Sequence, residues 1–423
     1  MKAYPKYIES GESWIGAIPE GWRIVRIAKL FSENKIKNSD YEFSHALKFN
    51  YGNLIPKGEE GDVSDLKETY IAYTKINKAD IAINCLNLNY DFVSQRVAIA
   101  KENGIITSAY LILSPRNGVN SEYYNYFFKA MDNRKLFHGM GTGIRLTLSY
   151  SELKKHNVCV PSQMEQQTIV LFLNEEIARI NDLISEAEKE ISLLNELKQA
   201  EIAHMVTCGI NPNVPMKDSG IAWIGKIPAH WQLRKMKFLF EERTEKNHPN
   251  EPILCSTQAY GVIPQSLYDN RVVVVNTGFE NLKLVEEGDF VISLRSFQGG
   301  IEYAHYRGII SAAYTILRSN GVLSNDYTRY LFKCFPFIQL LKTCVKGIRE
   351  GQNINYDMLR NNFLFIPPKE EQKAIVSAID ENNKKIDTLT FQLSNQITYL
   401  KELKQRVISD AVTGKIDVRD YKN

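Results

Sequence analysis

The sequence predicts an α+β protein: two similar mixed α/β domains in a pseudo-two-fold arrangement, joined by two long antiparallel helices that form a coiled coil. Three observations predict this. One set of motifs occurs twice: the segment that begins at Ser10 returns at Ser219, 209 residues later. Each copy combines short β-rich runs with a helical segment. Each copy then ends in a stretch without glycine or proline, 165–207 in the first and 369–413 in the second.

The internal repeat spans whole domains. A Trp-Ile-Gly-x-Ile-Pro motif at 14–19 returns at 223–228, and the Tyr-Gly pair at 51–52 returns at 260–261. A period this long exceeds that of a solenoid unit. Two such domains form a pseudo-dimer, whose natural target has two similar faces, as duplex DNA has. The halves diverge between the shared motifs. This divergence suggests one scaffold with two readouts, although drift after duplication is an alternative explanation.

Residues 1–160 form the first predicted domain. Its β-rich runs are 80–84, 97–100 and 110–113, and a helix is expected from Ser121 to Phe137. The glycine-rich segment that follows the helix is interpreted as a loop rather than a nucleotide site. Trp14, Trp22, Trp223 and Trp231, which recur with the repeat, are expected to anchor the two cores rather than to stack on bases.

A long helix is predicted at 161–210. Ser162 and Glu165 form a capping-box pattern at its start. Apolar residues then recur in steps of three and four, which is the period of a coiled-coil seam. The seam residues are Ile177, Ile180, Ile184, Ala187, Ile191 and Leu194.

The second half repeats this plan. Residues 211–366 form the second domain, with strands at 272–275 and 290–293 and a helix from Ser324 to Lys342. A second long helix is predicted at 367–415, followed by a tail at 416–423. Its seam contains one 4-4 interruption and consists of Ile386, Leu389, Leu393, Ile397, Leu400, Leu403 and Val407.

Each long helix alone would expose its stripe of isoleucine and leucine. The simplest solution is that each helix buries the other's stripe, and the domain between them favours an antiparallel pair. A seam that packs on its own domain, or that makes a homodimer, is the alternative. Paired helices of this length would act as a rigid spacer between the domains.

Composition excludes several classes of protein. The chain has 423 residues, a net charge of +3 and six cysteines, none of them in a Cys-x-x-Cys pair. Scattered cysteines fit a reduced, cytoplasmic protein rather than a disulfide framework or zinc site. No apolar run approaches the ~18 residues of a membrane span, and the N-terminal residues do not form a secretion signal. We therefore expect no membrane association.

The common catalytic motifs are missing. The sequence lacks a G-x-x-x-x-G-K-[ST] phosphate loop, a G-x-G-x-x-G turn after a strand and an H-E-x-x-H pair. The Glu-x-Lys patterns at 196–198 and 402–404 resemble those of nuclease metal sites. They lie on the seam helices without a nearby aspartate, so surface ion pairs are the favoured interpretation.

Taken together, the duplicated motifs resemble the DNA specificity subunit of Type I restriction-modification systems. They are the Trp-Ile-Gly-x-Ile-Pro-x-x-Trp opening, a Tyr-Gly element followed by Ile-Pro, a Gly-Asp-Phe-Val-Ile-Ser strand at 288–293 and a Pro-x-x-x-Glu-Gln lead into each long helix. The resemblance covers essentially the whole chain. In the first half Ala79-Asp80 stands where the second half has Gly288-Asp289, a minor departure.

The resemblance implies a non-catalytic subunit. Each domain would be a target recognition domain that reads one part of a split, asymmetric sequence in double-stranded DNA. The helices would set the gap between the parts and contact two methyltransferase (modification) subunits. Restriction subunits with translocase activity would join the full complex. This chain itself would bind no metal or cofactor, and S-adenosylmethionine, ATP and Mg²⁺ would belong to the partner subunits.

Loops that follow strands are the expected DNA-reading segments, because the strand fixes their position while their side chains vary. Base edges and phosphates are contacted by arginine, lysine, amide and hydroxyl side chains. The candidate residues are Lys48, Tyr51, Asn53, Asn84, Asn87 and Arg145 in the first domain, and Gln258, Tyr260, Arg295, Ser296, Gln298, Lys346 and Arg349 in the second.

Two other classes of function are weighed against this one. A structural or adaptor protein with duplicated protein-binding domains is the main alternative. A nuclease or methyltransferase with unrecognised motifs is the second, and the missing catalytic motifs disfavour it. For any single candidate residue, an ordinary surface role is an equally good interpretation.

Overall fold

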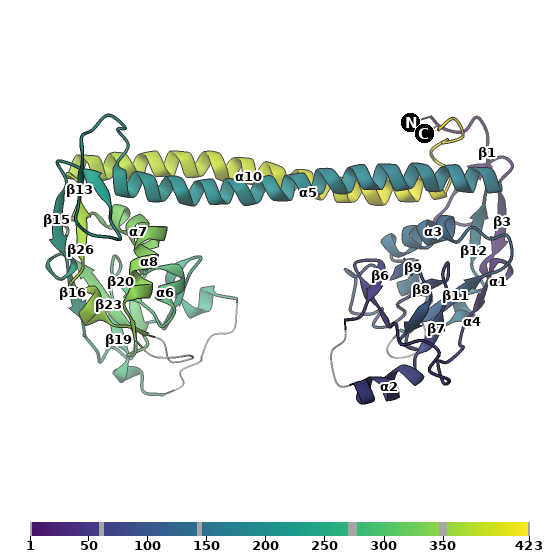
Figure 1. Cartoon of the computed structure of the whole chain (residues 1–423), viewed down its shortest axis with the longest axis horizontal. Coiled ribbons are helices and arrows are strands. Elements are labelled where there is room, and N and C mark those ends of the chain that lie inside the picture. Colours follow the sequence, from purple (N-terminus) through teal and green to yellow (C-terminus); the bar gives the residue numbers. More distant parts are fainter. Residues whose placement is uncertain (1, 59–62, 142–145, 270–276, 347–352, 422–423) are drawn as a thin grey trace. The chain divides into compact units, whose positions relative to one another are not determined.

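The computed structural model describes residues 2–58, 63–141, 146–269, 277–346 and 353–421. The chain divides into two compact units. Unit 1 consists of Met1–Ala187 and Asn395–Asn423, and unit 2 consists of Glu188–Ser394. Each unit therefore holds one α/β domain, the beginning of one long helix and the end of the other (Figure 1).

The domain of unit 1 is built around a four-stranded antiparallel sheet. Its strands are β4 (Phe31–Glu33), β11 (Leu111–Pro115), β8 (Ile81–Ile83) and β9 (Val97–Ile99), in that order. These bounds confirm the three predicted strands of this half. The remaining elements are β1 (Tyr7–Glu9), β2 (Ala17–Pro19), β3 (Arg23–Arg26), α1 (Ile27–Leu30), β5 (Leu47–Asn50), β6 (Asn53–Pro56), α2 (Val63–Ile71), β7 (Thr74–Ile76), β10 (Gly104–Ile106), α4 (Tyr150–Leu153) and β12 (Asn157–Val160).

Helix α3 (Ser121–Asn133) packs its buried face into the core of this domain. The Asn120 side chain accepts hydrogen bonds from the first backbone amides of the helix, which caps it. The helix ends before the predicted Phe137. Lys135 adopts a left-handed conformation with φ +58°, and the chain continues as the 3-10 helix η1 (Leu136–Met140). The change of backbone conformation explains the shorter helix.

The domain of unit 2 repeats the same sheet. Strands β16 (Phe240–Arg243), β23 (Thr315–Ser319), β20 (Phe290–Ile292) and β21 (Glu302–Tyr303) follow the order of their counterparts in unit 1. The predicted strand at 272–275 lies outside the described residues. The other elements are β13 (Met216–Asp218), β14 (Lys226–Pro228), β15 (Gln232–Lys235), η2 (Met236–Phe238), β17 (Leu254–Thr257), β18 (Gly261–Pro264), η3 (Gln265–Leu267), η4 (Phe279–Asn281), β19 (Lys283–Val285), α6 (Ser296–Gly299), β22 (Gly308–Ile310), β24 (Val345–Lys346), β25 (Asn353–Ile354), α9 (Tyr356–Leu359) and β26 (Phe363–Ile366).

The single helix predicted from Ser324 to Lys342 is wrong. Two helices occupy this segment, α7 (Asn325–Lys333) and α8 (Phe335–Thr343). Cys334 between them is extended, and Pro336 lies in the first turn of α8. Proline has no N–H to donate within a helix and is tolerated in the first turn, so a helix restarts there instead of continuing.

Two long helices, α5 (Gln163–Cys208) and α10 (Lys369–Val412), begin in the same way. Ser162 and Glu165 form the predicted capping box, with the Ser162 backbone N–H donating to Glu165 Oε2 at 3.3 Å. The indole N–H of Trp22 also donates to Glu165, at 3.2 Å. Trp231 donates to Glu371 at 3.0 Å in unit 2. The repeated tryptophan and Glu-Gln motifs thus connect each domain to the helix that follows it.

The four tryptophans lie in the domain cores, as predicted. Trp22 and Trp231 are 4% and 0% exposed. Trp14 and Trp223 are half-buried and pack against Phe127 and Phe337, respectively.

Within each unit the two long helices pack antiparallel, which confirms the predicted coiled coil. In unit 1 the Lys404 ammonium donates to Asn181 at 2.8 Å. In unit 2 Lys198 pairs with Asp387 at 2.6 Å, and Asn382 donates to Glu201 at 2.5 Å. The residue numbers fall on one helix as they rise on the other.

One predicted seam residue faces solvent. Leu389 is 48% exposed, while Thr390 beside it is half-buried. With Thr390 in the seam, the step from Ile386 is four residues and the step to Leu393 is three. The 4-4 interruption seen in the sequence therefore comes from choosing the apolar residue of the pair rather than the residue at the seam position.

The end of each long helix packs on the domain of the other half, which differs from the alternative of a seam that packs on its own domain. The Tyr123 hydroxyl in α3 donates to the Val412 carbonyl at the end of α10, at 3.0 Å. Tyr327 in α7 donates in the same way to Val206 near the end of α5, at 2.7 Å. Val418 in the C-terminal tail is buried in the core of unit 1. No helix among the described residues is long and apolar enough to cross a membrane.

Candidate nucleic-acid interface

The turn between β5 and β6 presents the first group of candidate residues. Asn50 pairs with Asn53, so Tyr51 and Gly52 are the two turn residues, with φ +46° and φ +72°. Positive φ at both positions defines a type I′ turn, for which asparagine followed by glycine is the usual choice. A tyrosine at the first position carries backbone strain. Its side chain is 88% exposed, so packing does not account for its presence.

The matching turn of unit 2 has another geometry. Thr257 pairs with Gly261 across β17 and β18, which leaves a three-residue loop. The Thr257 side chain accepts from the backbone N–H of Tyr260 at 3.0 Å and donates to the Gly261 carbonyl at 3.0 Å. The loop residues have negative φ, and Gly261 directly after them has φ +72°. Tyr260 is 63% exposed without the strain that Tyr51 carries.

A buried arginine organises the second candidate loop of unit 1, which joins β8 to β9. Arg96 is 0% exposed. Its guanidinium donates to the carbonyl oxygens of Asn84, Leu86, Asn87 and Asp91, at 3.1, 2.6, 3.4 and 2.7 Å. Four backbone acceptors of one loop converge on one cation, so the loop has a defined shape despite its lack of regular structure.

The same loop displays apolar side chains to solvent. Tyr90, Phe92 and Val93 are 82%, 54% and 91% exposed, and the Phe92 ring stacks on His138 of η1. The Asp91 carboxylate accepts from the backbone amide of Ser94 at 2.9 Å. Hydrogen bonds from Ser94 lower the pKa of Asp91 to about 2. Exposed rings on a rigid loop can contact thymine methyl groups or wedge between bases.

The corresponding loop of unit 2 is shorter and contains α6. Gly300 follows α6 with φ +89°, and a Cβ there would collide with the Phe332 carbonyl. The Ser296 hydroxyl accepts from the Ser293 N–H at 2.8 Å. Ser296 is 2% exposed, so this predicted DNA-reading side chain is buried and shapes the loop instead.

The structure brings the two candidate loops together in each unit. In unit 1 the Gln95 side chain lies against Gly52 of the turn. In unit 2 a Cβ on Gly299 would lie 2.6 Å from the Gln258 side chain. Glycine at these positions allows the close approach. Each unit therefore has one surface formed by a hairpin turn and the loop between two central strands.

Most other predicted residues are accessible from solvent. Asn84 is half-buried and accepts from the Leu86 N–H at 3.1 Å. The backbone of Lys346 lies in β24. Arg145 and Arg349 lie outside the described residues. The exposed candidates are Lys48, Tyr51, Asn53, Asn87, Gln258, Tyr260, Arg295 and Gln298.

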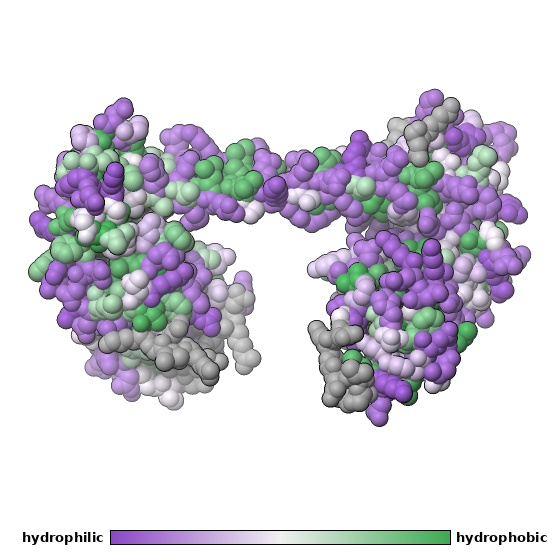
Figure 2. Space-filling model, viewed as in Figure 1, coloured by the Kyte–Doolittle hydropathy of each residue, from purple (hydrophilic) through white to green (hydrophobic). Residues whose placement is uncertain are grey.

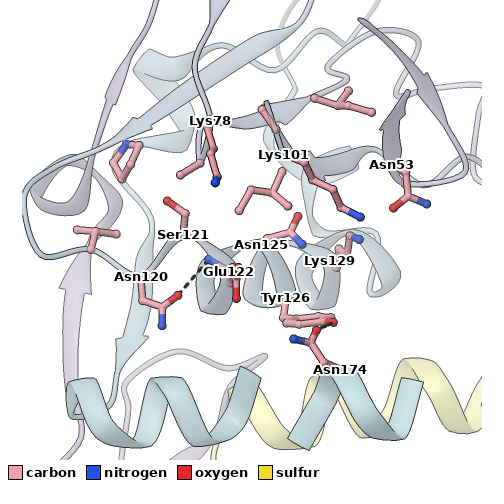
Figure 3. Close-up of a pocket in the computed structure, with 17 residues that line it drawn as sticks. Asn53, Lys78, Lys101, Asn120, Ser121, Glu122, Asn125, Tyr126, Lys129 and Asn174 are labelled. Atoms are coloured by element: carbon pink, nitrogen blue, oxygen red, sulfur yellow. Dashed lines mark hydrogen bonds between the residues drawn. The ribbon is translucent and has the colours of Figure 1, made fainter. Parts of the chain in front are cut away.

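Beside these loops, unit 1 has a cleft of 670 Å³. Its walls are the β5–β6 turn, the ends of β8 and β9, and α3. Figure 3 shows Lys78 and Lys101 extending toward α3, which carries Asn125, Tyr126 and Lys129. Asn53 and Lys129 also line a neighbouring cavity, which Lys401 and Lys404 of α10 border. The predicted Asn53 thus lies at the edge of a basic surface.

Lys129 is half-buried and makes no hydrogen bond or ion pair to any other part of the chain that the structure describes. Burial, together with the positive charges of Lys404 and Lys101, lowers its pKa to about 8. Asp132, the nearby acid, acts in the opposite direction, but its Oδ2 already accepts from the Arg96 N–H at 2.7 Å.

The corresponding positions of unit 2 carry different charges. Lys333 in α7 takes the place of Lys129, and its ammonium pairs with Glu302 of β21. Glu302 lies where unit 1 has Ala98, because β21 and β9 pair in the same register with β20 and β8. Glu287 takes the place of Lys78. A pocket beside it is lined by Arg243 and several acidic groups: Glu286, Glu287 and Asp289.

Sequence reasoning missed Arg96, Lys129, Lys101 and Glu302 as determinants of this surface. A signal for them exists, because the two copies of the repeat can be compared position by position. Ala98 opposite Glu302 and Arg96 opposite Gly300 are changes of charge within a shared frame. Such positions mark where the two domains have taken on different tasks.

The described residues contain no group of histidine, cysteine, aspartate or glutamate side chains placed to hold a metal ion. The lysines of the two Glu-x-Lys patterns, Lys198 and Lys404, instead contact the facing helix.

The two halves of the chain each match the same protein family. The model of the Type I restriction modification DNA specificity domain family matches residues 19–193 and 228–399. The putative type I restriction enzyme MjaX specificity subunit of Methanocaldococcus jannaschii is 22% identical over 432 residues, covering 96% of each chain. The type I restriction enzyme EcoKI specificity subunit of Escherichia coli K12 is 21% identical over 437 residues, covering 95% of this chain and 90% of that one.

Two solved structures share the fold. One chain of a type I R-M system has a TM-score of 0.67 at 14% identity, covering 94% of this chain and 99% of that chain. The HsdS subunit from Thermoanaerobacter tengcongensis has a TM-score of 0.53 at 15% identity, covering 94% and 98%.

Proposed function

The chain belongs to the Type I restriction-modification DNA specificity family, and on that premise we propose that its two domains each read one part of a split, asymmetric DNA sequence. As a member of this family the chain is a DNA sequence-recognition subunit. The finer assignments, namely which domain reads which part, what sets the gap and which surfaces meet partners, form the proposal.

One observation carries the proposal: the same pair of loops meets in both units but displays different side chains. Unit 1 presents Tyr51, Asn53 and the Arg96-organised loop, and unit 2 presents Gln258, Tyr260 and α6. A common frame with divergent loops suits direct readout, in which base edges are read by side chains held at fixed positions. The exposed amide and aromatic side chains can contact base edges.

We propose that α5 and α10 set the gap between the two parts of the DNA target. A coiled coil suits this role because its length follows from residue number, at ~1.5 Å per residue. Inserting seven residues into both helices preserves the heptad and adds ~10 Å, which corresponds to up to about three base pairs. Methylation sites mapped by sequencing would then show a longer gap. An unchanged gap would show that the helices do not act as the spacer.

The same helices would contact two methyltransferase subunits. Within unit 2 four apolar side chains on the helix pair are exposed: Leu193 at 54%, Leu197 at 47%, Leu389 at 48% and Phe391 at 66%. Figure 2 shows hydrophobic atoms at the surface of the helix pair. Leu193 and Leu197, four residues apart, lie on one face of α5, and exposed apolar side chains of this kind fit the apolar face of another helix.

Catalysis would then belong to the partners. The methyltransferase subunits would carry S-adenosylmethionine, and restriction subunits would carry ATP and Mg²⁺ in a cytoplasmic complex. A methylation assay of this chain without partners tests this point. Methyl transfer by the chain alone would favour the enzyme alternative.

A domain exchange tests the division of labour. Replacing residues 1–160 with the first domain of another family member should change one part of the methylated sequence and leave the other part and the gap unchanged. A change in both parts would contradict independent reading by two domains. Binding of the wild-type chain and its methyltransferase complex to random duplexes distinguishes DNA recognition from an adaptor role, since an adaptor would show no affinity for DNA.

A further inference from the structure

Lys129 in the unit 1 cleft makes no ion pair with the described residues, and the nearby Asp132 already accepts from the Arg96 N–H. Lys129 is half-buried, and no described residue pairs with it. A partly desolvated ammonium without a partner costs free energy. Lys101 and Lys404 lie close enough to add to that cost through repulsion, since both lower its pKa. An anion in the cleft would offset both terms at once.

The repeat offers an internal control. In unit 2 the lysine at the same position, Lys333, is neutralised by Glu302, which is 3% exposed. Unit 1 has Ala98 at the position of Glu302, so its lysine keeps a free charge. A second position also changes from positive charge in unit 1 to negative charge in unit 2: Lys78 lines the unit 1 cleft, and Glu287 stands at the equivalent position of unit 2.

We infer that the unit 1 cleft binds a phosphate of the DNA backbone through Lys101 and Lys129, and that the corresponding cleft of unit 2 does not bind one. This inference rests on the proposed function. Asn53 of the β5–β6 turn lines the same cleft, so a phosphate there would hold the duplex next to the side chains that read bases. Phosphate contacts fix the register of a protein on DNA and carry no sequence information themselves. Unit 1 would therefore supply sequence-independent affinity that unit 2 lacks.

The test measures binding of the full chain to a random-sequence duplex by fluorescence anisotropy over a range of KCl concentrations. Lys129→Gln should weaken binding roughly three- to tenfold and reduce the slope of log K against log [KCl] by about 1. Lys155→Gln is the matched control, because it removes an exposed lysine of unit 1 that pairs with Glu152. The control should leave both quantities unchanged.

Two exchanges between the units complete the design. Glu302→Gln should free Lys333 and tighten binding by a similar factor, whereas Ala98→Glu should mimic unit 2 and weaken binding. Because Ala98 is fully buried, Lys129→Gln keeps the test decisive if Ala98→Glu fails to fold. Inorganic phosphate at matched ionic strength distinguishes a free anion from the DNA backbone.

Unchanged affinity and salt slope in Lys129→Gln, with a wild-type chain that binds DNA, would overturn the inference and leave the proposed function intact. A wild-type chain that binds no duplex, alone or with its methyltransferase partners, would overturn both. Stronger competition from inorganic phosphate than from KCl, with an unchanged DNA salt slope in Lys129→Gln, would assign the cleft to a free anion and reject the DNA contact.

Discussion

The clefts of the two units share a frame and differ in charge. The unit 1 cleft is lined by residues at the ends of β9 and β11 and by α3, and the unit 2 pocket by residues of β16 and β23 and by the start of α7. In unit 1 the lysine on that helix is unpaired within the described residues, and in unit 2 its counterpart is held by a buried glutamate. The difference shows that a duplicated scaffold keeps the apolar contacts that fold it, while polar positions on the same elements change independently.

The largest expected effect concerns the loop that only unit 1 builds around a buried cation. Arg96→Met should lower the free energy of unfolding of unit 1 by about 3 kcal/mol, because it leaves carbonyl oxygens and Asp91 without their partner. Hydrogen exchange should rise in peptides covering 84–95 and stay constant in those covering 293–299. Arg295→Met, which removes an exposed arginine of unit 2, is the control. Unchanged exchange at 84–95 would show that the loop does not depend on Arg96.

The two cleft lysines should respond in opposite directions. Lys333→Met should destabilise unit 2 by about 2 kcal/mol, because it leaves the Glu302 carboxylate buried without its cation. Lys129→Met should stabilise unit 1 by about 1 kcal/mol, because it removes a charge that is partly buried without an ion-pair partner. Urea denaturation followed by unit-specific hydrogen exchange measures both. Destabilisation by both variants would remove the contrast between the clefts.

The two exposed turn tyrosines should differ in strain. Tyr51→Asn should stabilise unit 1 by about 1 kcal/mol, since asparagine tolerates a positive φ and the tyrosine ring packs on little. Tyr260→Asn should leave stability within about 0.5 kcal/mol, because the backbone there is relaxed. Both variants should weaken binding to the cognate DNA. Equal stability changes at the two sites would show that the strain at Tyr51 is relieved elsewhere.

Lys129 also contributes a pH dependence to the stability of unit 1. Burial lowers the pKa of folded Lys129 to about 8, below the ordinary lysine value of ~10.4. At this site the unfolded chain therefore binds more protons than the folded chain between those values, and the contribution of Lys129 to the stability of unit 1 becomes more favourable as the pH rises across that window. Lys129→Met should remove this rise. The difference between wild type and variant, measured by denaturation from pH 7 to 10, isolates the contribution. A difference that does not change with pH would contradict the low pKa.

The fold could be predicted best from the features that occur in both copies of the repeat. The tryptophans, the Glu-Gln pairs and the seam each occur in both halves, and each performs the same packing task twice. Leu389 was misplaced because hydrophobicity alone identifies a seam only when the apolar residue of a neighbouring pair lies at the interface. The division of this segment into α7 and α8 has a local cause in Pro336, which begins a helix readily but does not continue one.

The candidate DNA surface was predicted less completely. Exposed segments after strands can be located from the pattern: Tyr51 lies in the turn after β5, Asn53 begins β6 next to that turn, and Gln298 lies in the short helix α6 after β20. Burial of Ser296 and convergence of four carbonyl oxygens on Arg96 depend on how the chain closes in three dimensions. A local sequence pattern does not reveal these contacts, because the partners of Arg96 and Ser296 are backbone groups that every residue possesses.

The partition of the chain into units has a consequence for biosynthesis. Unit 2 is one continuous stretch, whereas unit 1 needs residues 395–423 to cover Tyr123 and the apolar start of α5. During synthesis the first domain leaves the ribosome early, but its contacts with α10 form only after the end of that helix has emerged. The second domain matures sooner. Until then the nascent first half exposes the apolar residues that the end of α10 covers, and exposed apolar surface of this kind favours aggregation.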